Sequence, residues 1–250
     1  MKLFEAEKLR HELAIFGNLR RFKKTYEFKE ELKNLNSTSF WNTKTKKDQK
    51  DLTRSPIYKD KICIISNFLK TKNGKLLDVG FGLGYLEKKL TGCLKLSLFG
   101  IDISEVAVDK AQKTLRGEYR VAGIFKIPYK SSFFDIVLIL DVIEHIQTDK
   151  TLKAYGEIVR VMKKNGILVV SIPLNEGLEE MIKHGKNPNS HMRNYTPAIL
   201  KAELKLFGFK IIKESYLYAF QNNYWLKSFF LRLLPFEMKK PNLMIVFARK

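Results

Sequence analysis

The chain has 250 residues, of which 45% are hydrophobic, and its 46 Lys and Arg against 26 Asp and Glu give a formal net charge of +20. This apolar content excludes a disordered or fibrous chain, and the length fits one domain with extensions. The longest apolar stretch, Phe133 to Ile146, is broken by three acidic residues and is shorter than the roughly 20 residues that span a bilayer. We therefore expect one globular domain without a transmembrane helix.

The cysteines and the amino terminus indicate a cytoplasmic protein. Cys63 and Cys93 are the two cysteines, and neither lies in a Cys-x-x-Cys pair or at a Cys/His spacing that suits zinc. Glu5 and Glu7 fall where a signal peptide would need an apolar run. We expect a reducing compartment and no metal centre.

The positive charge is scattered along the chain. Such a charge attracts nucleic acid, anionic lipid or acidic substrates. A lysine-rich composition produces the same scatter without any such partner. The charge alone therefore leaves the partner open.

Helices are predicted on both sides of a polar segment near the amino terminus. Apolar residues at helical spacing predict one or two amphipathic helices over residues 1–35 and another helix from Ile57 to Leu69. Between them, Asn34 to Lys50 is rich in Ser, Thr, Asn and Lys and predicts a loop. We expect the Phe40-Trp41 pair in this loop to pack back onto the domain.

Short apolar runs and helical patterns alternate through the rest of the chain. The predicted strands are Lys75–Val79, Lys95–Ile101, Gly117–Val121, Phe134–Leu140, Gly166–Ile172, Phe209–Tyr216 and Leu243–Ala248. The predicted helices are Tyr85–Leu90, Ser104–Leu115, Thr151–Val161 and Pro197–Leu206. This alternation predicts an α/β fold with a doubly wound, mostly parallel, seven-stranded sheet. Residues 1–70 would form an N-terminal helical extension and lid, and residues 71–250 the main domain.

A glycine-rich turn follows the first predicted strand. Gly80, Gly82 and Gly84 leave a bare backbone surface at the carboxyl edge of the sheet, where open sheets bind ligands. Asp102 ends the second strand, where a carboxylate can accept both hydroxyl protons of a ribose. Nicotinamide dinucleotide folds use Gly-x-Gly-x-x-Gly, and here the third glycine comes one residue early. Asp78, inside the strand end, also suits a cationic amino-acid group better than a diphosphate, so the spacing favours S-adenosylmethionine.

Residues 75–172 resemble the class I S-adenosylmethionine-dependent methyltransferases, particularly the small-molecule group that includes ubiquinone-biosynthesis O-methyltransferases. The matching segments are Leu77–Gly84, Gly100–Ser104, Ile127–Tyr129, Ser132–Asp135 and Val142–His145. The resemblance implies a Rossmann-like methyltransferase fold, with S-adenosylmethionine as cofactor and S-adenosylhomocysteine as its product.

The resemblance also implies roles for residues at the sheet edge. The turn from Gly80 to Gly84 would line the methionine part of the cofactor, Asp102 would hold the ribose hydroxyls and Ile103 would contact adenine. Gly123 stands where many relatives carry an acid, so the backbone at Ile124 would hold adenine instead. The complete set of predicted cofactor-binding residues is Asp78, Gly80, Phe81, Gly82, Gly84, Asp102, Ile103, Gly123, Ile124, Leu140 and Asp141.

Glu144 and His145 are the predicted catalytic residues. Methyl transfer from a sulfonium is an in-line displacement, so alignment can supply much of the acceleration. An oxygen acceptor also benefits from a base, and both residues lie just beyond the fourth predicted strand, near the cofactor. His145 is the residue we expect to contact the acceptor. The alternative is that the pair only caps the following segment by hydrogen bonds.

Six further residues are secondary candidates. The loop histidines His184 and His191 are expected to be solvated. Arg193 and Tyr195 could hold an acidic or phenolic acceptor or belong to a lid. Trp41 and Tyr58 could cover the cofactor or only pack against the domain.

Aromatic and basic residues gather in the segment Tyr216–Phe236. One hypothesis is an interfacial helix that makes peripheral membrane contact and reaches a lipid-like acceptor. Core packing and a homodimer face are the alternatives.

The leading hypothesis is therefore a methyltransferase that acts on an oxygen or nitrogen of a small or lipid-like acceptor. Methylation of RNA or another nucleic acid is supported only by the charge, and the Asn-Pro-Pro-Tyr sequence expected for base amines is absent after the fourth strand, where Asp141-Val-Ile-Glu stands. A third hypothesis is a non-catalytic S-adenosylmethionine-binding protein. The intact Asp78, Gly82 and Asp102 favour a working pocket.

Overall fold

The computed structural model describes residues 36–47, 55–185, 187, 189–219, 223–233 and 240–250. The predicted amphipathic helices over residues 1–35 lie outside these ranges. None of the helices in the described ranges is both long and apolar enough to cross a membrane.

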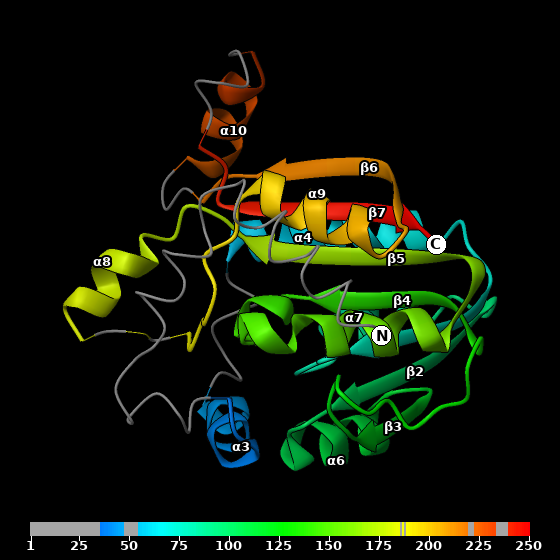
Figure 1. The fold of residues 1–250 in the computed structure, drawn as a ribbon. Helices are drawn as coiled ribbons and strands as arrows, with labels where there is room; N and C mark the ends of the chain where they lie inside the picture. Colours follow the sequence, from blue (N-terminus) through cyan, green and yellow to red (C-terminus); the bar gives the residue numbers. More distant parts are fainter. Residues whose placement is uncertain (1–35, 48–54, 186, 188, 220–222, 234–239) are drawn as a thin grey trace.

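Seven strands form one sheet in the order β3-β2-β1-β4-β5-β7-β6, which confirms the predicted fold class (Figure 1). The strands are β1 Gly74–Val79, β2 Leu96–Asp102, β3 Glu118–Val121, β4 Phe134–Leu140, β5 Met162–Pro173, β6 Lys210–Leu217 and β7 Leu243–Arg249. The first five strands pair in parallel, and β7 is antiparallel to both β5 and β6. The fifth strand begins earlier than predicted, with a register shift against β4.

Helices cover both faces of the sheet. They are α3 Thr38–Lys47, α4 Pro56–Leu69, α5 Tyr85–Leu90, α6 Glu105–Thr114, α7 Thr151–Val161, α8 Leu178–Lys183, α9 Pro197–Leu206 and α10 Tyr224–Leu233, with short 3₁₀ helices η4 Ile143–His145 and η5 Thr148–Lys150. Figure 1 shows α7 and α9 in front of the sheet and α4 behind it. The helices predicted from Tyr85, Thr151 and Pro197 match the observed bounds.

The alternation of side chains along the central strands builds the two cores. In β1, Leu77 and Val79 face the core beneath α7 and α9, whereas Leu76 faces the core beneath α4 and α5. Both faces of the central sheet are therefore buried, as a parallel sheet between helical layers requires.

The polar segment predicted to be a loop contains a helix, α3, so that prediction was wrong. The first turn of this helix is closed by Ser37, whose hydroxyl accepts a hydrogen bond from Phe40 N at 3.2 Å. Asn42 Oδ1 accepts hydrogen bonds from Ser104 Oγ at 2.9 Å and Val106 N at 3.4 Å. These contacts with the start of α6 stabilise a helix whose own sequence carries no apolar stripe.

The register of the sheet brings the predicted site residues to one edge. Val79, the last residue of β1, pairs with Ile101 of β2 and Ile139 of β4. Gly80, which follows β1, Asp102, which ends β2, and Asp141, which follows β4, therefore lie at the same carboxyl edge.

Candidate active site

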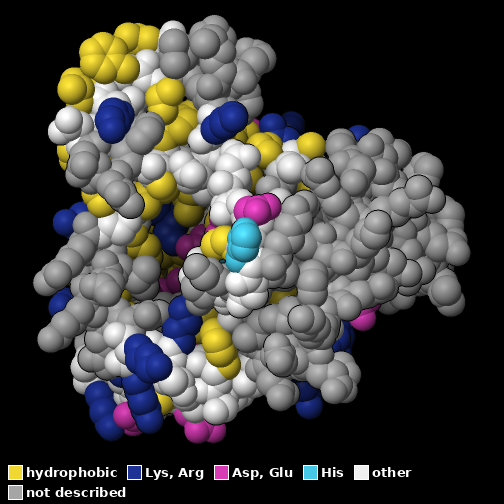
Figure 2. Space-filling model, turned by 90° about the vertical axis from the view of Figure 1, so that its left-hand side faces the viewer, with side chains coloured by type: hydrophobic (Ala, Val, Ile, Leu, Met, Phe, Trp, Pro, Cys, Tyr) yellow, Lys and Arg dark blue, Asp and Glu magenta, His cyan; other side chains and the backbone are white. Residues whose placement is uncertain are grey.

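A cavity of about 700 Å³ opens at the carboxyl edge of the sheet. Its walls come from α3 and from the loops that follow β1, β2, β3 and β4. Of the predicted site residues, the cavity is lined by Gly80, Gly82, Asp102, Ile103, Gly123, Ile124, Asp141 and His145. The molecule is visibly hollowed on this face (Figure 2).

Asp102 joins the loop after β1 to the loop after β2. Its Oδ2 accepts a hydrogen bond from Gly82 N at 2.9 Å, and its Oδ1 accepts one from Ser104 N at 2.8 Å. Burial raises the pKa of Asp102, although these backbone N–H groups oppose the rise by stabilising the carboxylate. Each oxygen keeps capacity for a further donor on the cavity side, as binding to a vicinal diol requires.

The glycine turn is needed for two different reasons. Gly80 has φ +77°, and a Cβ there would lie 2.6 Å from Val142 Cγ2, inside van der Waals contact. Gly82 has φ +58° and no atom within 4 Å of a Cβ position, so its open side is the cavity itself. Gly80 therefore lets two protein segments approach, whereas Gly82 leaves space for a ligand.

Four of the predicted cofactor residues do not line the cavity. Phe81 is buried against Tyr119, with ring centroids 5.1 Å apart, and Leu140 packs into the core on the α4 side. Gly84 starts α5, and a Cβ on it would meet Leu115 Cδ1 at 2.4 Å. The fourth, Asp78, is discussed next. These residues support the turn from behind, and their predicted contacts with the cofactor stay predictions.

Asp78 lies behind the turn beside Glu87 of α5, and both carboxyl groups are buried. Burial and the neighbouring Glu87 raise the pKa of Asp78 well above its ordinary value, and burial also raises the pKa of Glu87. Two adjacent carboxyl groups away from solvent resist double ionisation. Glu87 was missed in the sequence because it lies in a short helix and is followed directly by two lysines, a pattern typical of an exposed surface.

Asp141, directly after β4, is held by a lysine from α4. It has φ +55°, forms an ion pair with the buried Lys61, and accepts a hydrogen bond from Ser171 Oγ at 2.5 Å. Burial acts to raise the pKa of Asp141, but the charge and hydrogen bond of Lys61 lower it below its ordinary value. Sequence analysis missed Lys61, although Ile57, Lys61 and Ile65 share one face of α4 at a spacing of four residues, which could have revealed a buried lysine.

His145 is a neutral side chain with a defined tautomer. Its Nδ1 lies 3.2 Å from Ser190 O, and because a carbonyl oxygen only accepts, Nδ1 carries the hydrogen and Nε2 keeps its lone pair. Burial and the neighbouring His191 lower the pKa of His145 to about 3. The imidazole also stands edge-on to Trp41, with ring centroids 4.9 Å apart. His145 is therefore unprotonated over the whole neutral range, with a free lone pair on Nε2.

Glu144 differs from its neighbour because its carboxyl group is fully buried and does not line the cavity. Burial, reinforced by the charge of Asp141, raises its pKa well above the ordinary value. Its carbonyl oxygen accepts hydrogen bonds from Met192 N at 2.8 Å and Arg193 N at 3.0 Å, which ties the loop before α9 to the site. The backbone of Glu144 therefore holds this loop, and the catalytic role predicted for its side chain stays a prediction.

His191 is placed against His145, with ring centroids 4.8 Å apart. It is buried, and its Nδ1 lies 2.7 Å from Glu176 Oε2. The expectation that it is solvated was therefore wrong, whereas His184 is solvated and its side chain is 68% exposed. Glu144, His145 and His191 bring ligand atoms within 4.8 Å of one another, a combination able to hold a divalent cation. The expectation of no metal stays a prediction.

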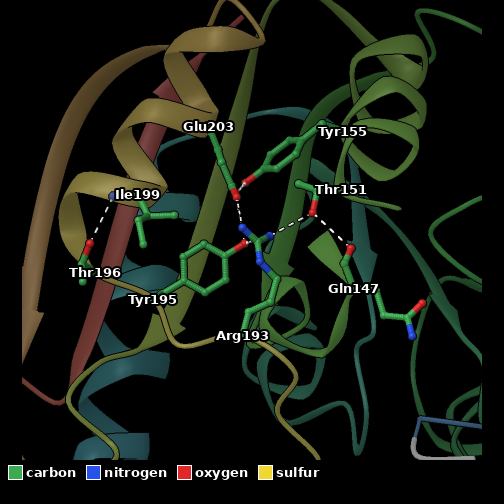
Figure 3. A network of polar contacts seen from close by, with 8 residues as sticks. All are labelled: Gln147, Thr151, Tyr155, Arg193, Tyr195, Thr196, Ile199 and Glu203. Atoms are coloured by element: carbon green, nitrogen blue, oxygen red, sulfur yellow. Dashed lines mark hydrogen bonds and ion pairs between the residues drawn. The ribbon is translucent and has the colours of Figure 1, made fainter. Parts of the chain in front are cut away.

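Arg193 and Tyr195 belong to a buried polar network and not to an acceptor-binding surface. Arg193 forms an ion pair with Glu203 of α9 and donates to Thr151 Oγ1 of α7 at 3.0 Å. The hydroxyl of Tyr195 donates to Glu203 Oε2 at 3.0 Å, and Tyr155 donates to the same oxygen at 3.2 Å (Figure 3). Both candidates are buried, so the hypothesis that they hold the acceptor was wrong. They attach the loop that carries His191 to α7 and α9.

The start of the described chain covers the cavity. Asn36 Nδ2 donates to His145 O at 3.3 Å and to Ser190 O at 3.0 Å. Trp41 and Lys44 of α3 line the cavity, as the lid hypothesis expected of Trp41, whereas Tyr58 packs against Tyr85 outside it. Asn36 and Lys44 were missed because they lie in the polar segment that was predicted to be a loop.

Comparison with known proteins agrees with this geometry. Residues 77–170 match a family described as a methyltransferase domain. An uncharacterized protein of Methanocaldococcus jannaschii is 26% identical over 165 residues, which cover 65% of this chain and 66% of that protein. The ubiquinone biosynthesis O-methyltransferase of Bartonella quintana is 27% identical over 148 residues, which cover 54% of this chain and 59% of that enzyme.

A solved structure shows the same fold. The N-methyltransferase NodS of Bradyrhizobium japonicum, in complex with S-adenosylhomocysteine, superimposes with a TM-score of 0.61 at 12% identity, covering 84% of this chain and 98% of its own. The sheet, the glycine turn and the domain match define a Rossmann-like methyltransferase fold. The chain matches a methyltransferase-domain family over residues 77–170 and shares the fold of S-adenosylmethionine-dependent methyltransferases. It spans between 49% and 66% of the length of the first curated relatives that it matches.

Proposed function

We propose that the protein transfers a methyl group from S-adenosylmethionine to an oxygen or nitrogen of a small or lipid-like acceptor. The observation that carries this proposal is that one cavity joins Asp102 and the bare backbone of Gly82 to a neutral His145. The first two suit a nucleoside with a free ribose diol, and the third suits an acceptor that loses a proton. Of the similar proteins, one is named as an O-methyltransferase and another as an N-methyltransferase.

The residues around the cavity fit the cofactor. Asp102 would hold the ribose hydroxyls, Ile103 would lie against adenine and the backbone of Gly80 and Gly82 would line the methionine part. S-adenosylmethionine, when bound, supplies a methyl group on a sulfonium leaving group. The protein's task is then to align the acceptor and to exclude water.

His145 is the proposed proton acceptor for a hydroxyl substrate. Nε2 of His145 would accept the hydroxyl proton as the acceptor oxygen takes up the methyl group that the cofactor would supply. Because Nδ1 carries the hydrogen that is donated to Ser190 O, Nε2 is unprotonated in the resting protein. An amine acceptor would pass its own proton to the same nitrogen, Nε2 of His145.

Calorimetric titration with S-adenosylhomocysteine tests the cofactor assignment. Asp102→Ala should weaken binding roughly 10- to 100-fold, because it removes charge-assisted hydrogen bonds to the ligand and the link to Gly82. Asp109→Ala is the matched control, since Asp109 is an exposed aspartate on α6. Absence of binding by the parent, or equal binding by Asp102→Ala, would sink the proposal.

Turnover tests the catalytic assignment and separates an enzyme from a non-catalytic binding protein. With a panel of phenolic, sugar and lipid acceptors, formation of S-adenosylhomocysteine should depend on His145. His145→Gln should lower kcat by roughly 100-fold or more while leaving affinity for S-adenosylhomocysteine unchanged. Binding without any product, across the panel, would favour the non-catalytic alternative.

A further inference from the structure

The helix α10 presents a large apolar face to solvent. The five large apolar side chains on this face are more than half exposed: Trp225 66%, Leu226 57%, Phe229 57%, Phe230 57% and Leu233 70%. They follow one another at intervals of one or three residues, so they form one continuous stripe along the helix. We call these five residues the outer stripe.

The opposite side of the same helix is attached to the protein. Tyr224 is buried, and its hydroxyl donates a hydrogen bond to Asp60 Oδ2 of α4 at 2.8 Å. Ser228 and Leu231, one and two turns further on, are partly buried. The contacts of this inner side therefore fix the direction in which the outer stripe points, which is away from the sheet.

The outer stripe lies on the same side of the molecule as the cavity. In Figure 1, α10 projects beyond the end of the sheet at which β6 ends and β7 begins, and α3 lies at this end too. Figure 2 looks onto this side and shows hydrophobic side chains gathered at the top of the face, above its hollowed part. A surface that rested on the stripe would therefore be close to the cavity mouth.

The size of the stripe argues against a second copy of the chain as its partner. A stable protein interface takes about 20 to 30 residues from each side, whereas the stripe has five. The net charge of +20 also opposes the approach of an identical molecule and favours an anionic surface. The helix sequence itself contains Lys227 and Arg232 and no acidic residue.

The composition of the stripe suits the boundary of a lipid bilayer. Aromatic residues with flanking cations are typical of helices that lie in the headgroup region with their apolar side among the acyl chains. The 10 residues of α10 are too few to span a bilayer, so the helix would lie along the surface.

We propose that the outer stripe of α10 docks the protein on a membrane surface that contains anionic lipid. The five apolar side chains enter the headgroup boundary, and Lys227 remains at the level of the lipid phosphates. Docking places the cavity next to the bilayer, from which an amphiphilic acceptor can enter. The docking itself does not depend on the proposed methyl transfer.

Vesicle flotation at low salt tests the docking surface. The full chain should float with vesicles of equal parts phosphatidylcholine and phosphatidylglycerol, and more weakly with phosphatidylcholine alone. Phe229→Ser should weaken the partitioning of the protein into vesicles by roughly tenfold, because it removes one large apolar side chain that would be buried among the lipids. Leu94→Ser is the matched control, since Leu94 is an 82% exposed apolar residue in the turn after α5. Lys227→Glu should weaken binding to the anionic vesicles more than Lys89→Glu on α5.

Tryptophan fluorescence provides an independent readout. The chain has two tryptophans, Trp41 in the cavity wall and Trp225 on the outer stripe. Anionic vesicles should shift the tryptophan emission of the parent to the blue. The Trp225→Phe protein should still float with these vesicles but should show no such shift.

Three results would overturn the proposal. One is a parent chain that does not float with the anionic vesicles, and another is equal loss of binding in Leu94→Ser and Phe229→Ser. The third is a dimer, seen by light scattering, that Phe229→Ser separates into monomers. Affinity for S-adenosylhomocysteine should be unchanged in Phe229→Ser, so failure of docking is distinguishable from failure of the proposed activity.

Discussion

The two ends of the cavity are built from different kinds of contact. At the cofactor end, defined by Gly80, Gly82 and Asp102, the carboxylate binds backbone groups that are 20 and 2 residues away in the sequence. At the proposed acceptor end, defined by His145, the carbonyl oxygen of this residue accepts a hydrogen bond from Asn36, 109 residues away. Asp141 lies between the two ends and is held by Lys61, 80 residues away.

This difference has a consequence for substitutions. The geometry of the cofactor end depends on backbone conformation within two adjacent loops, so a single methyl group can disturb it. The acceptor end depends on buried polar contacts between distant elements, so removal of one partner leaves a buried charge or donor unsatisfied. The predictions below test this contrast.

The largest effect is expected for Glu203→Ala. This variant leaves the guanidinium of Arg193 buried without its carboxylate partner, which should lower the free energy of unfolding by roughly 3–5 kcal/mol. Urea denaturation of the parent and the variant at neutral pH measures the difference. Because the pair anchors the loop of His191, turnover should fall together with stability.

Two comparisons make this test specific. Asp109→Ala removes an exposed pair with Lys113 and should change the free energy of unfolding by less than about 0.5 kcal/mol. The double variant Arg193→Met/Glu203→Leu should recover most of the lost stability, because apolar residues of similar size leave no buried charge. A stable Glu203→Ala would show that the network does not hold the acceptor end.

The glycine turn offers a matched pair of substitutions at the cofactor end. Gly80→Ala should lower the free energy of unfolding by roughly 2–4 kcal/mol, because positive φ and a close contact with Val142 act together. Gly82→Ala meets no atom and should cost only about 1–2 kcal/mol. Its methyl group enters the cavity, so it should reduce affinity for S-adenosylhomocysteine more than its stability cost explains.

Gly92→Ala is the control for this pair, since a Cβ there meets no atom within 4 Å and its φ is not positive. Denaturation and calorimetry on all three variants give both quantities. Equal effects of Gly80→Ala and Gly82→Ala on stability and affinity would contradict the division of roles between the two glycines.

The neutral state of His145 predicts a pH dependence of stability. Its pKa is about 3 in the folded protein, compared with roughly 6.5 in an unfolded chain. Below pH 6.5 the unfolded state therefore binds a proton that the folded state does not, and the free energy of unfolding falls as the pH falls towards 3. Between pH 6.5 and pH 5 this contribution amounts to about 2 kcal/mol at most.

Measuring the parent and His145→Gln across this pH range isolates the contribution, because glutamine does not titrate. The stability advantage of the parent over the variant should shrink on acidification and stay constant above pH 6.5. His184→Gln is the control for removing a histidine outside the cavity. A parent curve parallel to that of His145→Gln would show that the imidazole is not held neutral.

The contrast between the two ends also explains which features could be predicted from the sequence. The strand, glycine turn and Asp102 follow one another within a short stretch, and each has a local conformational requirement. The central strands are continuous apolar runs between turn residues, so the seven-stranded sheet could be predicted as well. His145 was found through its position after a strand, which is again local information.

The missed features depend on contacts that form only in the folded chain. The helix α3 has a polar sequence and becomes stable through Asn42, which binds the start of α6. His191 reads as a solvated loop residue because the network of Arg193 and Glu203, which fixes that loop, joins elements that are separated in sequence. The pairing of Arg193 itself could not be predicted, since a buried carboxylate partner on α9 has no signature beyond its helical position.

Lys61→Met is expected to have the smallest effect, and it determines to which end Asp141 belongs. The lowered pKa of Asp141 contributes stability that is present above the unfolded value of about 3.9 and is lost as the pH falls through the folded value. Its side chain is 35% exposed, so solvent screening reduces the expected loss at pH 7 to about 1 kcal/mol. The loss should diminish as the pH falls through the lowered folded-state pKa of Asp141, because the protonated carboxyl group no longer attracts Lys61. Lys59→Met, which replaces an exposed lysine on the same helix, is the matched control.

If Asp141 borders the methionine part of the cofactor, Lys61→Met should also weaken S-adenosylhomocysteine binding several-fold, because the carboxylate loses the partner that positions it. An unchanged affinity would place Asp141 with His145, at the end of the cavity that the long-range contacts build.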